Sequence, residues 1–153
     1  MAFQITSHAF EDGGAIPVRH SCHGEDVSPP LAWTGAPAGT RSLALICDDP
    51  DAPVGTWVHW VVYNIPASTT TLPEGIAPDA ELSDGSQHGN NSWGRLGYGG
   101  PCPPSGTHRY FFKLYALDAT LQLAAGSDKK ALLKAMEGHI LDQAELMGTF
   151  TKP

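Results

Sequence analysis

The sequence contains no long hydrophobic run. None of its apolar stretches approaches the roughly 20 residues that a membrane-spanning helix needs. The first seven residues, 1–7, show neither the basic region nor the apolar core of a secretory signal peptide. These absences predict a protein without stable membrane insertion and with a cytoplasmic location.

Positive charge is also scarce. The chain has 9 Lys and Arg residues against 16 Asp and Glu residues, giving a formal net charge of −7. A negative field of this kind repels nucleic acid and anionic lipid surfaces, so the sequence predicts no nucleic-acid partner. Any anion that the protein binds must therefore be held by local hydrogen-bond donors.

Cysteine is rare as well. The three cysteines, Cys22, Cys47 and Cys102, form an odd set without a CxxC pair. This pattern argues against a disulfide framework and predicts reduced thiols, in keeping with a cytoplasmic protein.

Helical periodicity is missing from most of the chain and occurs only near its end. There, Ser127 is a candidate N-cap, Gly148 is a candidate C′ residue, and apolar residues between them fall at helical spacing. These apolar positions are Leu133, Met136, Ile140, Ala144 and Met147. The pattern predicts one substantial C-terminal helix over residues 127–148.

Short β-type runs fill much of the remainder. Residues 43–47, 57–65 and 108–117 combine β-branched, aromatic and alternating side chains, which are typical of buried strands. Weaker patterns predict strands at residues 3–7 and 16–20. Since 153 residues suffice for one hydrophobic core, we expect a single domain over residues 1–153, mainly β, with the helix packed on it.

Three carboxylates follow the first buried run. Asp48 has the ordinary interpretation of a turn former, because aspartate side chains bond nearby backbone amides. Asp49 and Asp51 flank Pro50, so the sequence predicts that both point to the same side. Two converging carboxylates need a cation, a shared proton or histidine partners, which favours a place in a pocket.

Two histidines and a tyrosine supply such partners. Strict alternation places His59 on one strand face with Trp57, Val61 and Tyr63, where a histidine is commonly a satisfied core residue. His108 and Tyr110 share a face at the start of another strand, directly after a loop rich in Gly and Pro. If the two strands are neighbours, the imidazoles, the phenol and the carboxylates meet at one edge of a sheet.

That loop includes Gly99, Gly100 and Pro101. Successive glycine N–H groups can form an anion-binding concavity, although the same residues can equally be a plain loop corner. Together with Tyr110 and the histidines, they fit a small oxyanion such as phosphate.

Two other kinds of site are compatible with the same residues. Asp and His in one cavity could perform acid–base chemistry, so a phosphoester hydrolase is the alternative to a binding protein, with Cys102 near His108 as a nucleophile to test. The same residue types could ligate zinc, but they lack the recurrent short spacing of zinc sites. The sequence favours a non-enzymatic protein without a metal or other cofactor.

Several motifs in order carry a wider resemblance. They are residues 28–33 (SPPLAW), 49–53 (DPDAP), 57–60 (WVHW), Asn91, and 97–110 (GYGGPCPPSGTHRY). With these motifs the chain resembles the phosphatidylethanolamine-binding protein family, in particular its compact bacterial and archaeal Raf-kinase-inhibitor-like branch. The resemblance extends from about residue 3 to residue 148.

The resemblance implies an antiparallel β-sandwich with a small anion pocket at one end. It assigns ligand binding to these residues: Asp49, Asp51, His59, Gly99, Gly100, Pro101, His108 and Tyr110. It further implies a cis peptide bond before Pro53, and Arg109, on the opposite strand face, is predicted to pair with Asp51. The implied partners are phosphate, a phospholipid head group or a nucleotide, a protein kinase or another signalling protein, and a second copy of the chain in a homodimer.

Overall fold

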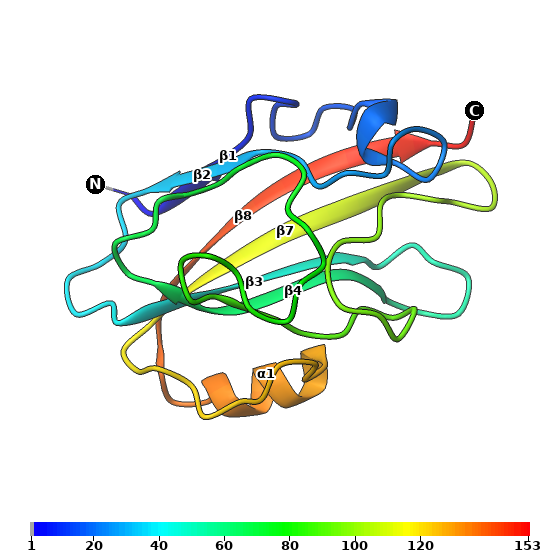
Figure 1. The fold of residues 1–153 in the computed structure, drawn as a ribbon. Helices are drawn as coiled ribbons and strands as arrows, with labels where there is room; N and C mark the ends of the chain where they lie inside the picture. The colour runs from blue at the N-terminus through cyan, green and yellow to red at the C-terminus, as the bar shows by residue number, and fades with distance from the viewer. Residues whose placement is uncertain (1) are drawn as a thin grey trace.

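The computed structural model describes residues 2–153, which form two antiparallel β-sheets and one short α-helix (Figure 1). The smaller sheet has the order β1-β2-β5, and the larger has the order β6-β4-β3-β7-β8. The strands are β1 (Gln4–Thr6), β2 (Leu31–Thr34), β3 (Ser42–Asp49), β4 (Trp57–Pro66), β5 (Thr71–Leu72), β6 (Gln87–His88), β7 (Thr107–Leu117) and β8 (Ile140–Thr151).

The main hydrophobic core lies between the two sheets. Trp33 on β2 belongs to the same cluster as Trp60 on β4 and Phe112 on β7, and all three are buried. The helix α1 (Lys129–Met136) covers the opposite face of the larger sheet, where Leu132 packs in a cluster with Tyr63 (Figure 1). The predicted antiparallel sandwich is therefore confirmed.

A buried ion pair fixes the helix to the sheet. Asp48, at the end of β3, is 1% exposed, and its carboxylate lies 2.6 Å from the ammonium group of Lys129 and 3.3 Å from that of Lys113. A buried carboxylate needs such partners, so Asp48 is more than a turn former.

The central strands were predicted closely by their apolar runs. The structure places β3, β4 and β7 over the three strongest β-type segments, and β1 falls within residues 3–7. Residues 16–20 do not form the predicted strand. They contain a 3-10 turn, η1 (Val18–His20), which follows Pro17 and buries the ring of His20 against the carbonyl oxygen of Val27.

The predicted long C-terminal helix is wrong beyond its first turns. The α-helix begins at Lys129, is capped by the side chain of Asp128, which accepts a hydrogen bond from the N–H of Ala131, and ends at Met136. Gly138 then takes a φ of +78°, which helix geometry does not allow, and β8 pairs with the whole of β7. Within residues 2–153, no helix is long and apolar enough to cross a membrane.

The cysteines also differ from expectation. Cys22 and Cys102 form a disulfide across 80 positions of sequence, and Cys47 is a buried free thiol. Spacing could not reveal this pair, because the two residues lie on separate loops that meet only in the fold. The cysteines therefore do not support a cytoplasmic location.

The turn between β3 and β4 differs from the family resemblance in one respect. The peptide bond before Pro53 is trans, and residues 2–153 contain no cis peptide bond. The turn is closed by a hydrogen bond, 3.1 Å long, from the N–H of Gly55 to the carbonyl oxygen of Ala52.

Candidate functional site

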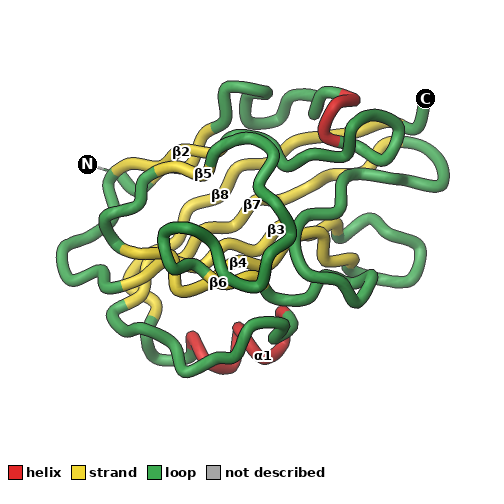
Figure 2. The backbone as a smooth tube through the Cα atoms, viewed as in Figure 1, coloured by secondary structure: helices red, strands yellow, loops and turns green. Residues whose placement is uncertain are grey.

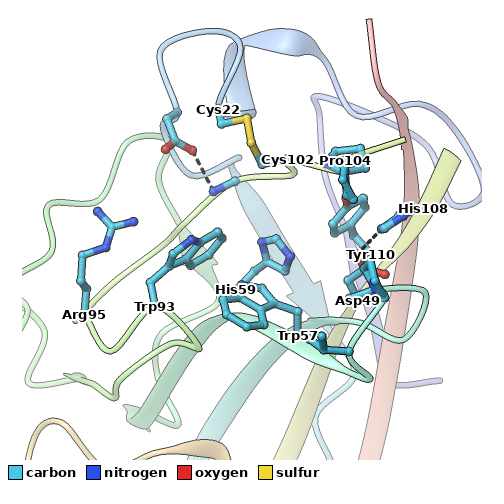
Figure 3. Close-up of a pocket in the computed structure, with 16 residues that line it drawn as sticks. Cys22, Asp49, Trp57, His59, Trp93, Arg95, Cys102, Pro104, His108 and Tyr110 are labelled. Atoms are coloured by element: carbon cyan, nitrogen blue, oxygen red, sulfur yellow. Dashed lines mark hydrogen bonds and ion pairs between the residues drawn. A yellow bond between two sulfur atoms is a disulfide. The ribbon is translucent and has the colours of Figure 1, made fainter. Parts of the chain in front are cut away.

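A cavity of about 350 Å³ lies at the end of the larger sheet where β3 ends and β4 and β7 begin. Loops account for much of the chain around this end (Figure 2). Three of them contribute to its wall: the segment after η1, the β3–β4 turn, and the segment before β7 (Figure 3). The lining residues are Cys22, Asp26, Asp49, Ala52, Pro53, Val54, Trp57, His59, Trp93, Arg95, Gly100, Cys102, Pro103, Pro104, His108 and Tyr110.

A β-bulge turns His59 into this cavity. Cys47 pairs with Trp60 and Asp48 pairs with Val58, so His59 is the extra residue on β4. The bulge breaks strict alternation, and the predicted common face of His59 with Val61 and Tyr63 is wrong. The His59 ring instead lies edge-on to Tyr110, with 5.1 Å between the ring centroids.

The hydrogen bonding of His59 fixes its tautomer. Its Nδ1 lies 2.7 Å from the carbonyl oxygen of Gly99, and a carbonyl can only accept, so Nδ1 carries the hydrogen. Burial lowers the pKa of His59, which favours the neutral ring. Its Nε2 is then a hydrogen-bond acceptor that a ligand can use.

The hydroxyl group of Tyr110 is the most unusual polar atom of the site. The residue is 1% exposed, and its hydroxyl oxygen is buried without a hydrogen-bond partner among residues 2–153. Such a group costs about 1–3 kcal/mol unless a partner is supplied. Burial raises the pKa of Tyr110, with a smaller contribution from the charge of Asp49, so the phenol keeps its proton and acts as a donor.

Asp49 and His108 form a buried pair beside this phenol (Figure 3). The Nδ1 of His108 lies 2.6 Å from one carboxylate oxygen of Asp49, and the other oxygen accepts the N–H of Asp51 at 2.7 Å. Both oxygens of this carboxylate are thus satisfied by the protein. The pairing leaves Nε2 of His108 as the nitrogen available to a ligand.

Asp51 does not join Asp49 in the cavity wall. Its two carboxylate oxygens accept hydrogen bonds from the guanidinium group of Arg109 at 2.8 and 2.9 Å, so the predicted pairing with Arg109 is confirmed. This contact with Arg109 lowers the pKa of Asp51 to about 2. The prediction that the two carboxylates converge is wrong, because Asp49 turns inward to His108 while Asp51 bonds outward.

The glycine segment serves close packing rather than an anion nest. The N–H of Gly99 donates to the carbonyl oxygen of His59 at 2.9 Å, and the N–H of Gly100 donates to the carboxylate of Asp26 at 2.8 Å. A side chain at Gly99 would collide with the ring of Trp93. Of this segment only Gly100 lines the cavity, and Gly99 and Pro101 do not.

The sequence did not indicate the aromatic wall. Trp57 and Trp93 meet edge to face with centroids 5.5 Å apart, and the guanidinium carbon of Arg95 lies 5.6 Å from the centroid of the Trp93 ring. A tryptophan and an arginine close to Asn91, inside a long Gly-rich loop, were the available signal.

Cys102, considered as a nucleophile, is bonded to Cys22 and is not a free thiol.

Comparisons with known proteins agree with this architecture. Residues 6–151 match the family model described as phosphatidylethanolamine-binding protein. A UPF0098 protein of Methanothermobacter thermautotrophicus is 55% identical over 148 residues, which cover 97% of this chain and 98% of that protein.

Two solved structures share the fold. A phosphatidylethanolamine-binding protein homologue of Chlamydia trachomatis, CT736, is 44% identical, with a TM-score of 0.92 and coverage of 99% of each chain. E. coli YbcL, described as a member of the mammalian family, is 33% identical, with a TM-score of 0.91 and full coverage of both chains. The chain therefore belongs to the phosphatidylethanolamine-binding protein family.

Proposed function

We propose that this chain is a binding protein whose cavity holds the phosphoryl group of a small phosphate or phosphate monoester. The observation that carries this proposal is the buried Tyr110 hydroxyl, which has a proton to donate and no acceptor among residues 2–153. A phosphoryl oxygen supplies that acceptor. The cavity volume of about 350 Å³ is at the small end of ligand pockets, which suits a phosphoryl group with a short substituent.

The two histidines add one hydrogen-bond donor and one hydrogen-bond acceptor to the donor of Tyr110. The Asp49 carboxylate binds Nδ1 of His108, so a hydrogen on Nε2 of the same ring would be donated to a bound anion. His59 is different, because its Nε2 accepts. A phosphate monoanion carries a hydroxyl group that can donate to this nitrogen.

Sulfate has the same shape but no proton at neutral pH. Its oxygen would face the lone pair of His59 Nε2, and a contact of that kind costs about 1–3 kcal/mol, or roughly 10-fold or more in affinity. The proposed arrangement therefore predicts discrimination between two ions of nearly equal size.

Isothermal titration at pH 6.5 and constant ionic strength tests the proposal, with phosphate, phosphoethanolamine and sulfate as ligands. We expect the two phosphates to bind at least about 10-fold more tightly than sulfate, because of the His59 acceptor. Asp51→Asn is the matched control, since Asp51 bonds to Arg109 outside the cavity wall, and its phosphate affinity should equal that of the wild type. Equal affinity for sulfate, or no binding of phosphate, would overturn the proposal.

No feature of this geometry favours hydrolysis. The one cysteine considered as a nucleophile is held in the disulfide, and Asp49 already has a partner on each oxygen. In this proposal, Asp49 orients the imidazole ring of His108 toward a bound anion.

A further inference from the structure

A second group of reactive side chains lies at the mouth of the cavity. Cys22, His23 and Cys102 each offer one metal-ligating atom, and these three atoms lie within 4.8 Å of one another. In the stretch from residue 2 to residue 153, no other set of three such side chains meets this distance. All three residues are exposed, so an ion can reach them from solvent.

We propose that the reduced form of the protein binds one Zn²⁺ ion through Cys22, Cys102 and His23. Zinc–sulfur and zinc–nitrogen bonds of about 2.3 and 2.0 Å place tetrahedral ligand atoms roughly 3.7 Å apart. The Cα atoms of the two cysteines are 5.4 Å apart, so side-chain rotation alone can separate the sulfurs to this distance. This proposal does not depend on the binding of an anion in the cavity.

The two cysteine loops are held together by more than the disulfide. The N–H of Cys22 donates to the carbonyl oxygen of Pro101 at 3.1 Å, and the hydroxyl of Tyr98 donates to the carbonyl oxygen of His20 at 2.7 Å. These bonds join η1 and the segment after it to the segment before β7. We therefore expect the thiols to stay opposite each other after the sulfur–sulfur bond is broken.

His23 is also held in position. Its N–H donates to the Oγ atom of Ser21 at 3.2 Å, and its ring lies nearly parallel to that of Phe150, at 8° and 6.1 Å between centroids. These contacts hold the imidazole beside the two sulfur atoms. A preformed arrangement reduces the ordering needed when the ion binds.

The cavity wall carries two carboxylates, those of Asp26 and Asp49, and one guanidinium group, that of Arg95. The net charge of the whole chain, −7, favours the approach of a cation. Two thiolates neutralise one Zn²⁺ ion, and three protein ligands leave a fourth position for water or a ligand oxygen. Because both cysteines line the cavity, this ion would lie at its mouth.

A thiol reductant can open the disulfide between Cys22 and Cys102. Two reductant thiols supply two electrons and two protons, become one disulfide, and convert the cystine into two cysteine thiols. Zinc then displaces the two thiol protons when it binds. The disulfide form has no thiolate to offer and should not bind the ion at this site.

The test uses the full chain, reduced with a phosphine and kept free of oxygen. Zn²⁺ is titrated in competition with a chromophoric chelator, and Co²⁺ is used as a spectroscopic probe. We expect one ion per reduced chain, with the intense visible bands and the sulfur-to-cobalt charge-transfer band of a tetrahedral thiolate site. The oxidised chain should show none of these signals.

Variants decide whether these residues are the ligands. Cys102→Ser and His23→Gln should each weaken zinc binding more than about 100-fold, since outer-sphere changes alone cost 10–100-fold. Cys47→Ala and His139→Gln are the matched controls, because both residues lie outside the cluster, and each should bind zinc like the wild type. Failure of the reduced wild type to bind zinc, or equal binding by Cys102→Ser, would overturn the proposal.

Discussion

The rings of His59 and Tyr110 meet edge to face across a strand that separates them in the sheet. His59 lies on β4 and Tyr110 on β7, while β3 runs between these strands, yet the ring centroids are 5.1 Å apart. The bulge at His59 makes this possible, because it turns the imidazole to the side of the sheet on which Tyr110 lies. The site therefore depends on one of the two register shifts between β3 and β4.

Removal of the Tyr110 hydroxyl should weaken phosphate binding without lowering the stability of the fold. In Tyr110→Phe, the unpartnered buried oxygen disappears, so the free energy of unfolding should stay equal or rise by up to about 1 kcal/mol. Phosphate affinity should fall about 10- to 100-fold, as expected for the loss of a hydrogen bond to a charged group. Urea unfolding and titration calorimetry measure the two effects.

Tyr63→Phe is the control for this prediction. The Tyr63 hydroxyl donates to the carbonyl oxygen of Ala124, and the residue packs in the cluster beneath α1. Its removal should lower stability by about 1 kcal/mol and leave phosphate affinity unchanged. If Tyr110→Phe is destabilised and binds phosphate normally, the hydroxyl has a structural partner and the assignment fails.

The strands were predictable because their signal is local. The apolar runs of β3, β4 and β7 and the alternating face of His108 and Tyr110 can be read without knowledge of their partners. The predicted C-terminal helix was wrong because residues 140–148 satisfy two periods at once. Alternation of Ala144 and Leu146, which continues through Gly148 to Phe150, fits a strand, and pairing with β7 selects the strand over the helix.

The parts of the site that sequence missed depend on contacts between distant segments. The bulge that turns His59 requires the register of β3 against β4, and the disulfide joins loops 80 positions apart. Asp49 and Asp51 flank the same proline, so the sequence alone does not distinguish their orientations. Their opposite orientations follow from His108 and Arg109, which lie side by side on β7 and face opposite ways.

Gly148 provides a test of the strand that replaced the predicted helix. A Cβ atom at this position would lie 2.5 Å from Cγ1 of Ile16 and 2.8 Å from the ring of Phe10, both in the core. Gly148→Ala should therefore lower the free energy of unfolding by about 1–3 kcal/mol through overpacking. Denaturant unfolding monitored by tryptophan fluorescence measures this change.

A double-mutant cycle with Ile16→Ala supplies the control. The smaller side chain makes room for the new methyl group, so the two changes should couple by about 0.5 kcal/mol or more. Simple addition of the two effects would mean that Gly148 matters for its backbone alone, as in a helix cap, and would contradict close packing of Gly148 against Ile16.

The disulfide should contribute substantially to stability. It closes a loop of 80 residues, and cross-links of this kind typically add about 2–4 kcal/mol by restricting the unfolded chain. The double variant Cys22→Ser/Cys102→Ser should lose about that much in urea unfolding. Reduction of the wild type should give the same loss and leave the double variant unaffected. Equal stability of the oxidised and reduced wild type would contradict this prediction.

Buried histidines should make the fold sensitive to mild acid. His88 accepts a hydrogen bond from the indole N–H of Trp60 at 3.0 Å, and its Nδ1 donates to the carbonyl oxygen of Asp79 at 2.7 Å, so the ring is neutral. Burial lowers the pKa values of His88 and His59 from the ordinary value of 6.5. Below pH 6.5 the unfolded chain then binds protons that the native state does not.

Stability should therefore be complete above pH 6.5 and fall as the pH is lowered through the two native pKa values. Each histidine contributes a slope of at most about 1.4 kcal/mol per pH unit. His88→Gln cannot titrate, so its unfolding free energy should fall less steeply between pH 6.5 and pH 5, whatever its value at pH 8. The slope is the decisive measurement, because substitution of a buried residue shifts absolute stability for other reasons. An unchanged slope would show that His88 takes up its proton equally well in the folded and unfolded chains.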